Sequence, residues 1–484
     1  MRSVLRSHEV SIAIFALLLG VYAFFYQGGG WNQNSRFDLV RAIVEDHALV
    51  IDRFEKNTGD DAIREGHTYC DKAPGASLLA VPAHAVVFAC AGSPRVVPAS
   101  TLATSAWLSI LLAVGVPSAI AATFLARAAR AMGYGEAVSI ATALGWAVGT
   151  MALPYATLLY GNQLAGSLDL IAFTLLLESK HAGRPLTRAR LAAVFALLAF
   201  AVATNYPSAL IGAGIALYAV HVAGLRAAIV GMLGAVLPLA LLFAYHHAAF
   251  GRALAFPYDF SVWQEPHTGW FMGLGKPSLT VLRDILFGEY RGLAWATPWL
   301  ALAIPGAIAA AQTRAHEVAV AVAAVALFLW LNASLPPRAW HGGWAAGPRY
   351  LVPMLPFAAL LAGAALKLVQ RERILVLAIV GLMLISTANM FAATAVKPEV
   401  PHGEPRPFSG FVWPRFLGGD LAVSRQSIDM IDNPAGGPKQ AFNLGMKLGL
   451  QGLSSLLPLG VWVTLTGVWL ARAVRRRATD RASD

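Results

Sequence analysis

The residues best suited to chemistry are concentrated in one polar stretch, 31–81, of an otherwise apolar chain. This stretch holds nine of the chain's 26 acidic residues, namely Asp38, Glu45, Asp46, Asp52, Glu55, Asp60, Asp61, Glu65 and Asp71. Asp71 is followed directly by Lys72, and an apolar run begins at Ala73. A carboxylate that accepts a proton from a hydroxyl group, beside a cation that binds an anion, is a pair suited to displacing a phosphate from a carbon atom.

Two arginines occupy comparable positions just before apolar runs. Arg349 and Tyr350 stand at the start of the run 348–367, and Arg291 precedes the run that begins at 295. A localised lysine charge or the planar fork of an arginine neutralises phosphate oxygens. We therefore expect Lys72, Arg349 and Arg291 to bind a lipid phosphate whose tail lies among the apolar segments.

Two of the carboxylates have simple structural interpretations. Asp38 has Arg41 and Glu45 three and seven residues further along, a spacing typical of a solvated helix face with ion pairs. Asp60 lies in the turn-rich stretch 58–61, where Asp commonly bonds its own backbone. Both nevertheless remain candidate bases.

The same alternative applies to the membrane-boundary residues. Asp71 can simply form an ion pair with Lys72, and Arg349 can simply anchor the end of its helix. His341, between Trp340 and Gly342, can be a polar contact of the core. Asp71 is the preferred candidate base, because its neighbouring cation stands at the edge of an apolar run.

The composition around these residues is that of a membrane protein. Of 484 residues, 57% are hydrophobic and 13% are charged, and the mean hydropathy is +0.59. Soluble chains carry about 25% charged residues. Many apolar runs exceed about 18 residues, enough to cross the hydrocarbon core of a bilayer. The net charge of +11 does not indicate nucleic acid, because the basic residues cluster in short loops and at the C-terminus.

We therefore predict an all-α polytopic membrane protein with about twelve spans and both termini in the cytoplasm, as the basic loops indicate. The spans are 10–26, 98–126, 137–155, 162–180, 190–205, 207–223, 227–248, 295–312, 316–334, 348–367, 373–395 and 448–471. The count requires that 74–91 dips into the membrane and returns, and thirteen spans are the alternative. The first outer loop, 27–97, is expected to contain an amphipathic helix, Asn34–Asp46, lying along the membrane surface.

The predicted organisation follows from these spans. A transmembrane module covers 1–396, with outer loops at 27–97 and 249–294. An extracytoplasmic loop covers 397–447, a last span 448–472 and a cytoplasmic tail 473–484. The location is the inner (plasma) membrane. Cys70 and Cys90 are not expected to form a disulfide, because a helix over 74–90 would hold them too far apart.

Several short motifs resemble those of the GT-C glycosyltransferases, especially family 39, which includes protein O-mannosyltransferases and the transferase that adds aminoarabinose to lipid A. They are the helix Asn34–Asp46 after the first span, Y-C-D-K-A-P-G at 69–75, H-H-A-A-F-G-R-A-L-A-F-P-Y at 246–258, Y-R-G-L-A-W-A-T-P at 290–298 and R-Y-L-V-P-M-L-P at 349–356. Segments 246–258 and 290–298 look like those of uncharacterised bacterial members.

The resemblance implies a polyprenyl-phosphate sugar donor, an inverting single displacement and an active site facing the cell exterior. The acceptor would be a glycan, a lipid or a protein, with membrane lipid as surroundings and no nucleic acid. Lys72 matches the family's donor-phosphate lysine and Arg349 the arginine of its R-Y-x-x-P motif. No cofactor is expected with certainty, although a divalent metal remains possible. The expected substrate-binding residues are Asn34, Arg36, Tyr69, His341 and Tyr350.

One departure from the family pattern concerns the catalytic base. The family's first-loop helix usually starts with an acidic pair, whereas Gln33-Asn34 stand here, and neither amide accepts a proton at neutral pH. Either Asp71, Asp38 or Asp60 has taken the role, or the activity has changed or been lost. A transporter or flippase of lipid-linked sugars is the other class considered, with Asp169 as its midspan marker.

Overall fold

The computed structural model describes residues 2–262, 274–337, 339–430 and 437–483. Helices dominate, and the described strands form only two antiparallel pairs, β1–β4 and β2–β3. The strands are β1 (Phe25–Tyr26), β2 (Asp61–Arg64), β3 (His67–Cys70) and β4 (Phe442–Asn443). The longer α-helices are α1 (Arg2–Ala23), α2 (Trp31–Arg41), α3 (Gly75–Cys90), α4 (Ala99–Ile110), α5 (Val116–Ala131), α6 (Glu136–Gly149), α8 (Gly161–His181), α9 (Arg188–Thr204), α10 (Ser208–Ala223), α11 (Leu225–Gly231), α12 (Val236–Phe250), α13 (Leu279–Phe287), α15 (Ala303–Ala333), α16 (Leu355–Leu368), α17 (Arg373–Val396) and α20 (Leu457–Ser483). The all-α prediction is confirmed.

Short helices complete the chain between these elements. The short α-helices are α7 (Ala152–Tyr155), α14 (Leu293–Ala296), α18 (Trp413–Leu417) and α19 (Leu444–Lys447). Among the 3-10 and π segments, η1 (Ala42–Asp46) continues α2, η2 (Asp52–Asn57) follows it, and η8 (Arg349–Met354) leads into α16. Irregular helical turns of this kind re-aim side chains between straight segments.

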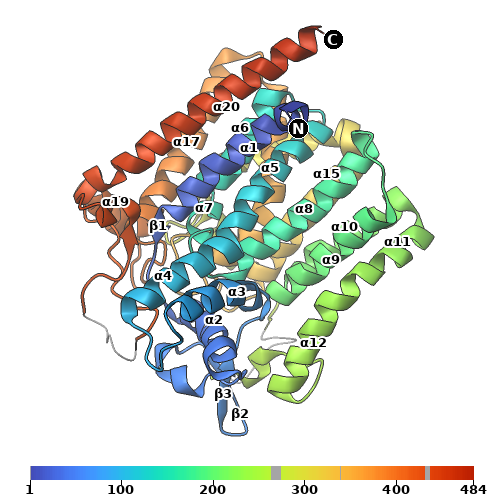
Figure 1. Cartoon of the computed structure of the whole chain (residues 1–484). Coiled ribbons are helices and arrows are strands. Elements are labelled where there is room, and N and C mark those ends of the chain that lie inside the picture. The colour runs from blue at the N-terminus through green and yellow to red at the C-terminus, as the bar shows by residue number, and fades with distance from the viewer. Residues whose placement is uncertain (1, 263–273, 338, 431–436, 484) are drawn as a thin grey trace.

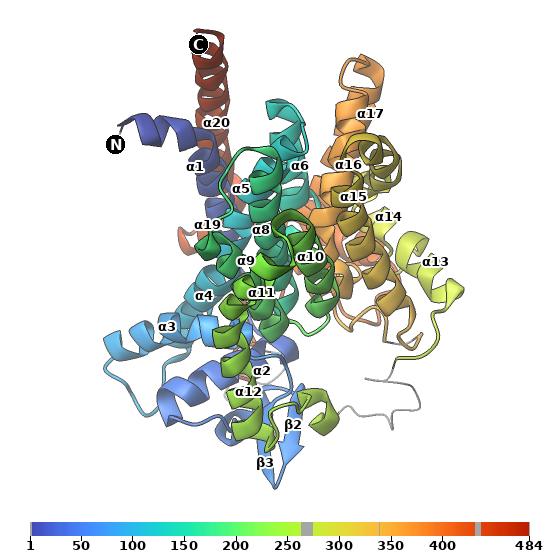
Figure 2. The same cartoon turned by 90° about the vertical axis from the view of Figure 1, so that its right-hand side faces the viewer.

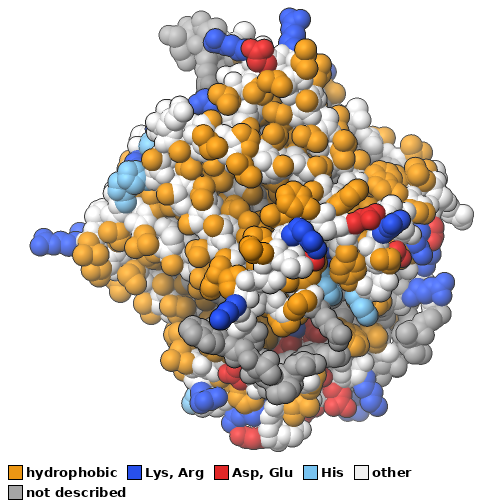
Figure 3. Space-filling view, turned by 180° about the vertical axis from the view of Figure 1, so that it is seen from behind, with side chains coloured by type: hydrophobic (Ala, Val, Ile, Leu, Met, Phe, Trp, Pro, Cys, Tyr) orange, Lys and Arg blue, Asp and Glu red, His pale blue; other side chains and the backbone are white. Residues whose placement is uncertain are grey.

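The helices are apolar enough to make a multi-pass membrane protein. Six described stretches have the length and composition to cross a bilayer, namely Ala99–Ala131, Leu225–Phe250, Pro298–Ala333, Arg349–Leu368, Arg373–Val396 and Gly452–Thr479. Shorter apolar helices are His8–Ala23, Gly75–Cys90, Glu136–Gly149 and Ser208–Ala223. Figure 3 shows hydrophobic side chains over most of one face, with charged side chains mostly in its lower half. The polytopic prediction is confirmed, and the count of twelve crossings and the domain boundaries stay predictions.

α15 consists of two helical segments joined at a kink. Arg314 has non-helical dihedral angles, φ −138° and ψ 45°. Just after the kink, Glu317 binds Lys180 near the C-terminal end of α8 (2.8 Å). At the far end of the second segment, Asn332 lines the cavity described below. The kink therefore coincides with the break expected between the spans 295–312 and 316–334.

Both termini lie at the same end of the bundle, and α2, β2 and β3 lie at the other (Figures 1 and 2). We call the end that carries α2 the cavity end. Figure 2 shows α3 running across the bundle at this end beside α2, whereas α5 and α8 run along it. The expectation that 74–91 dips into the membrane and returns stays a prediction.

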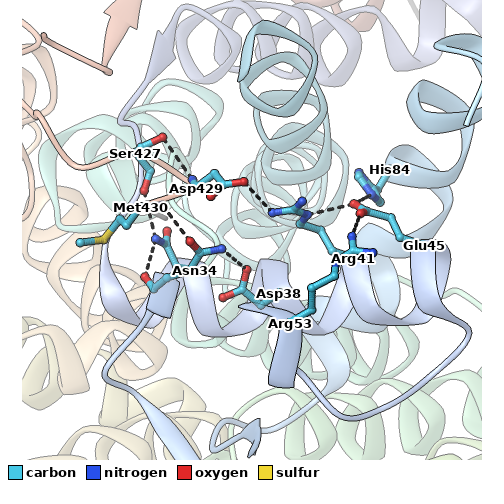
Figure 4. Close-up of polar contacts among 10 residues, drawn as sticks. Asn34, Asp38, Arg41, Glu45, Arg53, His84, Ser427, Asp429 and Met430 are labelled. Carbon is cyan, nitrogen blue, oxygen red and sulfur yellow. Dashed lines mark hydrogen bonds and ion pairs between the residues drawn. The ribbon is translucent and has the colours of Figure 1, made fainter. Parts of the chain in front are cut away.

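α2 corrects one prediction. A surface helix with a solvated polar face was expected, but every residue of α2 from Gln33 to Arg41 is buried. On the polar stripe, Asp38 accepts a hydrogen bond from Asn57 (3.0 Å), and Arg41 binds Asp429 (3.1 Å). Figure 4 shows these contacts on the side of α2 that faces the C-terminal segment. The polar stripe is therefore covered by protein, because partners from distant segments satisfy its charges.

The C-terminal segment 397–447 folds back onto the first loop. β1 pairs with β4 through Phe25 opposite Asn443, and the Tyr26 and Phe442 rings lie 5.0 Å apart. Asn34 donates to the Ser427 carbonyl oxygen (3.0 Å). Segments almost 400 residues apart in the chain thus build the cavity end together.

Candidate active site

A cavity of about 580 Å³ lies at the cavity end, where the first loop meets the ends of several helices. One part of its wall is polar or aromatic and comprises Trp31, Asn32, Arg36, Asp60, Asp71, Lys72, Tyr160, Asn162, Thr204, Asn205, Tyr258, Ser261, Asn332, Arg349 and Tyr350. Another part is apolar and includes Leu274, Phe328, Leu331 and Leu335. A polar head group and a hydrocarbon tail can therefore be accommodated in one continuous space.

A β-hairpin brings Asp60 and Asp71 together. β2 and β3 pair in the register that places Asp61 opposite Cys70. Glu65 and Gly66 turn the chain with positive φ angles of 54° and 83°, a geometry suited to a tight two-residue hairpin. Asp60 precedes β2 and Asp71 follows β3, so the two carboxylates flank the open end of the hairpin.

Lys72 lies between these carboxylates. Its Nζ is 3.0 Å from Asp60 Oδ2 and 2.9 Å from Asp71 Oδ2. Asp71 Oδ2 also accepts from Ser261 Oγ (3.3 Å), while buried Asp71 Oδ1 has no hydrogen-bond partner within the described residues. Burial lowers the pKa of Lys72, but the charges of Asp60 and Asp71 outweigh burial and raise it, so the ammonium group stays charged.

The two carboxylates differ in their affinity for a proton. Burial raises the pKa of Asp71 above its ordinary value, although Lys72 works against the shift. Burial acts in the same direction on Asp60, but the charges of Lys72 and Arg349 outweigh it and lower the pKa of that carboxyl. Asp71 is therefore the better proton acceptor of the pair, and Asp60 the more firmly ionised one.

Arg349 approaches the cavity from the other side, at the start of η8. Its Nη1 donates to the Tyr160 hydroxyl (2.8 Å), and its backbone carbonyl accepts from Asn162 Nδ2 (3.1 Å). Gly342 is needed beside it, because φ is +76° there and a Cβ would lie 2.5 Å from Arg349 Nε. Tyr350 follows Arg349 and also lines the cavity.

Arg36 supplies a third cation from α2. Its Nη1 donates to the Ala73 carbonyl (2.9 Å), beside Lys72. The described lining thus combines three cations, Arg36, Lys72 and Arg349, with two carboxylates, Asp60 and Asp71. This excess of one positive charge suits a phosphate diester, which carries a single negative charge.

Three predicted site residues of the first loop do not line the cavity. Asn34 is saturated by backbone groups, since Nδ2 donates to Asn57 O (2.8 Å) and Ser427 O and Oδ1 accepts from Gly30 N (3.1 Å). Asp38 is fully buried against Asn57, and burial raises its pKa well above the ordinary value. Tyr69 packs on Phe250 with ring centroids 5.5 Å apart.

Two further predicted residues also lie outside this cavity. Arg291 is buried with a positive φ of 120°, and it donates to Ala345 O (2.7 Å) and Val400 O (3.1 Å). It therefore ties two loops together. His341 lines a neighbouring cavity with Tyr290. The predicted residues that the structure brings together are Asp60, Asp71, Lys72, Arg36, Arg349 and Tyr350.

Sequence reasoning missed several residues of the site. Tyr160 and Asn162 form a short polar break between two apolar runs, a signal that was present in the sequence. Asn205, at the end of the expected span 190–205, also lines the cavity. Glu399 contacts Tyr160 from the far end of the chain (2.7 Å), and no local pattern marks it.

The structure offers no ready metal site in the part of the chain that it describes. No group of three or more His, Cys, Asp or Glu there is placed to hold a metal ion. Cys70 is buried and Cys90 exposed, and both are free.

The chain has the fold of the GT-C membrane glycosyltransferases. The crystal structure of ArnT from Cupriavidus metallidurans in the apo state matches with a TM-score of 0.53 and 15% sequence identity, over 96% of this chain and 75% of that chain. The crystal structure of the same ArnT bound to undecaprenyl phosphate gives a TM-score of 0.51 and 15% identity over the same shares. No family model matches the sequence, and no curated protein matches it either. The resemblance drawn from the motifs is thus confirmed at the level of the fold.

Proposed function

We propose that this protein is a membrane glycosyltransferase that moves a sugar from a polyprenyl-phosphate donor to an extracytoplasmic acceptor. The observation that carries the proposal is the Asp60–Lys72–Asp71 cluster, which shares one cavity with Arg349 and with an apolar wall. A phosphate with a hydrocarbon tail matches both halves of this cavity. The similar ArnT has been crystallised with undecaprenyl phosphate, which supports a donor of this class.

The donor phosphate binds between Lys72 and Arg349, with Arg36 close to Lys72. These cations stabilise the negative charge that develops on the leaving phosphate as the bond to the sugar breaks. The lipid tail extends along Phe328 and Leu331 of α15. Because both cations are held by hydrogen bonds before the substrate arrives, little reorganisation is needed at the moment of reaction.

The acceptor hydroxyl attacks the anomeric carbon of the sugar from the face opposite the phosphate. The new carbon–oxygen bond forms as the carbon–phosphate oxygen bond breaks, and the polyprenyl phosphate leaves with the bonding electron pair. The hydroxyl proton passes to Asp71, the carboxylate with the raised pKa. Asp60 stays ionised and keeps Lys72 in place. A single displacement of this kind inverts the anomeric configuration.

The cavity end faces the cell exterior in this proposal, and both termini lie in the cytoplasm of a cell with the protein in its inner membrane. The distribution of basic residues supports this orientation. Arg127, Arg184 and Arg190 all contact Glu178 at the end of α8 remote from the cavity, as the positive-inside rule expects for a cytoplasmic end.

A transporter of lipid-linked sugars is the competing proposal, and Asp169 is the observation in its favour. This carboxyl is fully buried in α8, and the hydroxyl group of Ser208 in α10 lies beside it. Intramembrane carboxyls often mark transport pathways. Asp169 does not belong to the described cavity lining, whereas the charged residues that do are gathered around one head-group space.

The test is sugar transfer by the purified protein in detergent with a polyprenyl-phosphate sugar, together with mass spectrometry of surface glycans in a deletion strain. Asp71→Asn and Lys72→Ala each abolish transfer, and the elution profile of each variant reports its folding. Glu65→Gln, whose side chain is 74% exposed in the hairpin turn, is the matched control and retains transfer. Near-normal turnover in both cavity variants contradicts the assignment. An unchanged glycan profile with lipid-linked sugar accumulating in the inner leaflet indicates transport instead.

A further inference from the structure

Glu399 is a buried carboxylate just behind the wall of the cavity, in the segment that follows α17. It is 4% exposed. Its Oε1 accepts a hydrogen bond from the Tyr160 hydroxyl (2.7 Å), and its Oε2 accepts one from Gln33 Nε2 (3.1 Å). The Tyr160 hydroxyl in turn accepts from Arg349 Nη1 (2.8 Å). A continuous set of hydrogen bonds therefore leads from Glu399 to a cation of the cavity.

The chemistry of the neighbours fixes the direction of every bond in this set. The Leu159 backbone N–H donates to Gln33 Oε1 (3.1 Å), so Gln33 directs its amide NH₂ group towards Glu399. Arg349 can only donate, so the Tyr160 oxygen accepts from it and the Tyr160 O–H donates to Glu399. The side chain at position 399 must therefore accept one hydrogen bond from Tyr160 and one from Gln33. A carboxylate does so, whereas an amide places a donor against a donor on one side.

The backbone around Glu399 is held from two sides. The Val400 carbonyl accepts from Ala345 N (3.0 Å) and from Arg291 Nη2 (3.1 Å). Gly30 lies so close that a Cβ there would be 2.8 Å from Glu399 Oε1 and 2.9 Å from Oε2. The first loop and the C-terminal segment therefore meet at this carboxylate without room for a larger residue at position 30.

Arg349 depends on this support. Its side chain makes no other hydrogen bond within the described residues than the one to Tyr160. Its guanidinium also lies over the Tyr160 ring, 5.1 Å from the centroid. With Nη1 fixed in this way, the remaining donors of the guanidinium are available to a phosphate in a defined orientation.

We propose that Glu399 is a positioning residue of the donor-phosphate site, which orients the Tyr160 hydroxyl and thereby holds Arg349 ready for the phosphate of a polyprenyl-phosphate donor. This inference rests on the proposed function. It assigns the C-terminal extracytoplasmic segment a part in donor binding, which the sequence motifs assign to Lys72, Arg349 and Arg291. It also assigns Arg291 the role of bracing the backbone beside Glu399 in place of contacting the phosphate.

Binding of undecaprenyl phosphate to the purified full-length protein tests the proposal, because it needs no knowledge of the sugar or the acceptor. Glu399→Gln raises the Kd about tenfold, the order expected when a hydrogen bond to a charged group is lost. The double variant Gln33→Glu/Glu399→Gln restores the wild-type Kd to within about twofold, because it remakes every hydrogen bond with the amide and the carboxylate exchanged. Arg349→Ala weakens binding, and adding Glu399→Gln to it causes no further loss.

The outcomes separate this inference from the proposed function. If the wild-type protein does not bind undecaprenyl phosphate, the proposed function fails. If the wild-type protein binds it and Glu399→Gln binds equally well, only the positioning role is overturned. A swap variant as weak as Glu399→Gln, or a further loss in the Arg349→Ala background, overturns it as well. Glu404→Gln is the control and leaves the Kd unchanged. Glu404 lies five residues after Glu399 and contributes neither to the cavity lining nor to the hydrogen bonds that lead from Glu399 to Arg349.

Discussion

Asp60 and Asp71 share one lysine but hold their protons differently. Both lie within 3.0 Å of Lys72 Nζ. Arg349 adds a second positive charge near Asp60 and reinforces its ionisation, whereas burial dominates at Asp71. A base must be ionised to act, so the two candidates make opposite predictions for the pH dependence of transfer.

With Asp71 as the base, the rate of sugar transfer falls on acidification with a midpoint above about 3.9, the ordinary pKa of an Asp. The raised pKa leaves this carboxyl protonated, and unable to accept a proton, at pH values where an ordinary Asp is ionised. With Asp60 as the base, the midpoint lies below that value. Measuring kcat/KM for the donor against pH distinguishes the two, because this ratio reports the ionisation of the free enzyme.

Substitutions complete this measurement. Asp71→Asn lowers kcat by about 10² to 10⁴, the usual contribution of a general base. Asp60→Asn loosens Lys72 and raises the KM for the donor more than it lowers kcat. The reverse pattern, with kcat lost only in Asp60→Asn, assigns the base to Asp60.

Local sequence predicted the residues of the hairpin, and the start of an apolar run marked Arg349 and Tyr350. Asp71 and Lys72 are adjacent, and Asp60 lies at the other end of the same short hairpin, so local structure brings them together. Glu399 lies 239 residues from Tyr160 and 366 from Gln33. Contacts at such separations are fixed by tertiary packing, and no periodicity of a single sequence reports them.

At the scale of elements, α2 shows why one pattern has two structural meanings. Its polar stripe has the spacing of an amphipathic surface helix, and the sequence analysis interpreted it so. The structure instead covers the stripe with the 397–447 segment and with η2 (Figure 4). Periodicity shows which residues share a helix face. Whether that face contacts water or protein depends on the segments that pack against it, which periodicity does not report.

Arg41 is the residue on which this covered face depends. Its guanidinium is almost completely buried and binds Glu45 (2.9 Å) and Asp429 (3.1 Å). We expect Arg41→Ala to destabilise the protein by about 3–5 kcal/mol, because it removes a buried cation that pairs with Asp429 and with Glu45, while Glu45 retains its contact with Arg53. Thermal unfolding of the purified protein in detergent measures the loss.

Arg53 provides the matched comparison. It binds the same Glu45, but 45% of its side chain is exposed. We expect Arg53→Ala to cost no more than about 1 kcal/mol, as exposed ion pairs do. Equal and small losses of stability in the two variants would show that the ion pairs of Arg41 with Glu45 and Asp429 do not hold the first loop to the C-terminal segment.

At the scale of the whole molecule, the termini and the cavity lie at opposite ends of the bundle (Figures 1 and 2). Composition and apolar run length were sufficient to predict a polytopic helical protein, because the bilayer allows few alternatives. The expectation that 74–91 does not span the membrane followed from counting basic loops and stays a prediction, and α3 runs across the cavity end (Figure 2).

The two native cysteines allow this topology to be measured directly. Cys90 is exposed at the end of α3, and Cys70 is buried beside Ser35. With the cavity end outside the cell, a membrane-impermeant maleimide labels Cys90 in intact spheroplasts, and Cys90→Ala abolishes the labelling. In the Cys90→Ala background, Arg475→Cys places an exposed thiol on the C-terminal tail. That thiol reacts only after the membrane is permeabilised. Labelling of Arg475→Cys from outside, with Cys90 protected until lysis, would contradict the predicted orientation. The cavity would then face the cytoplasm, where an extracytoplasmic acceptor cannot reach it.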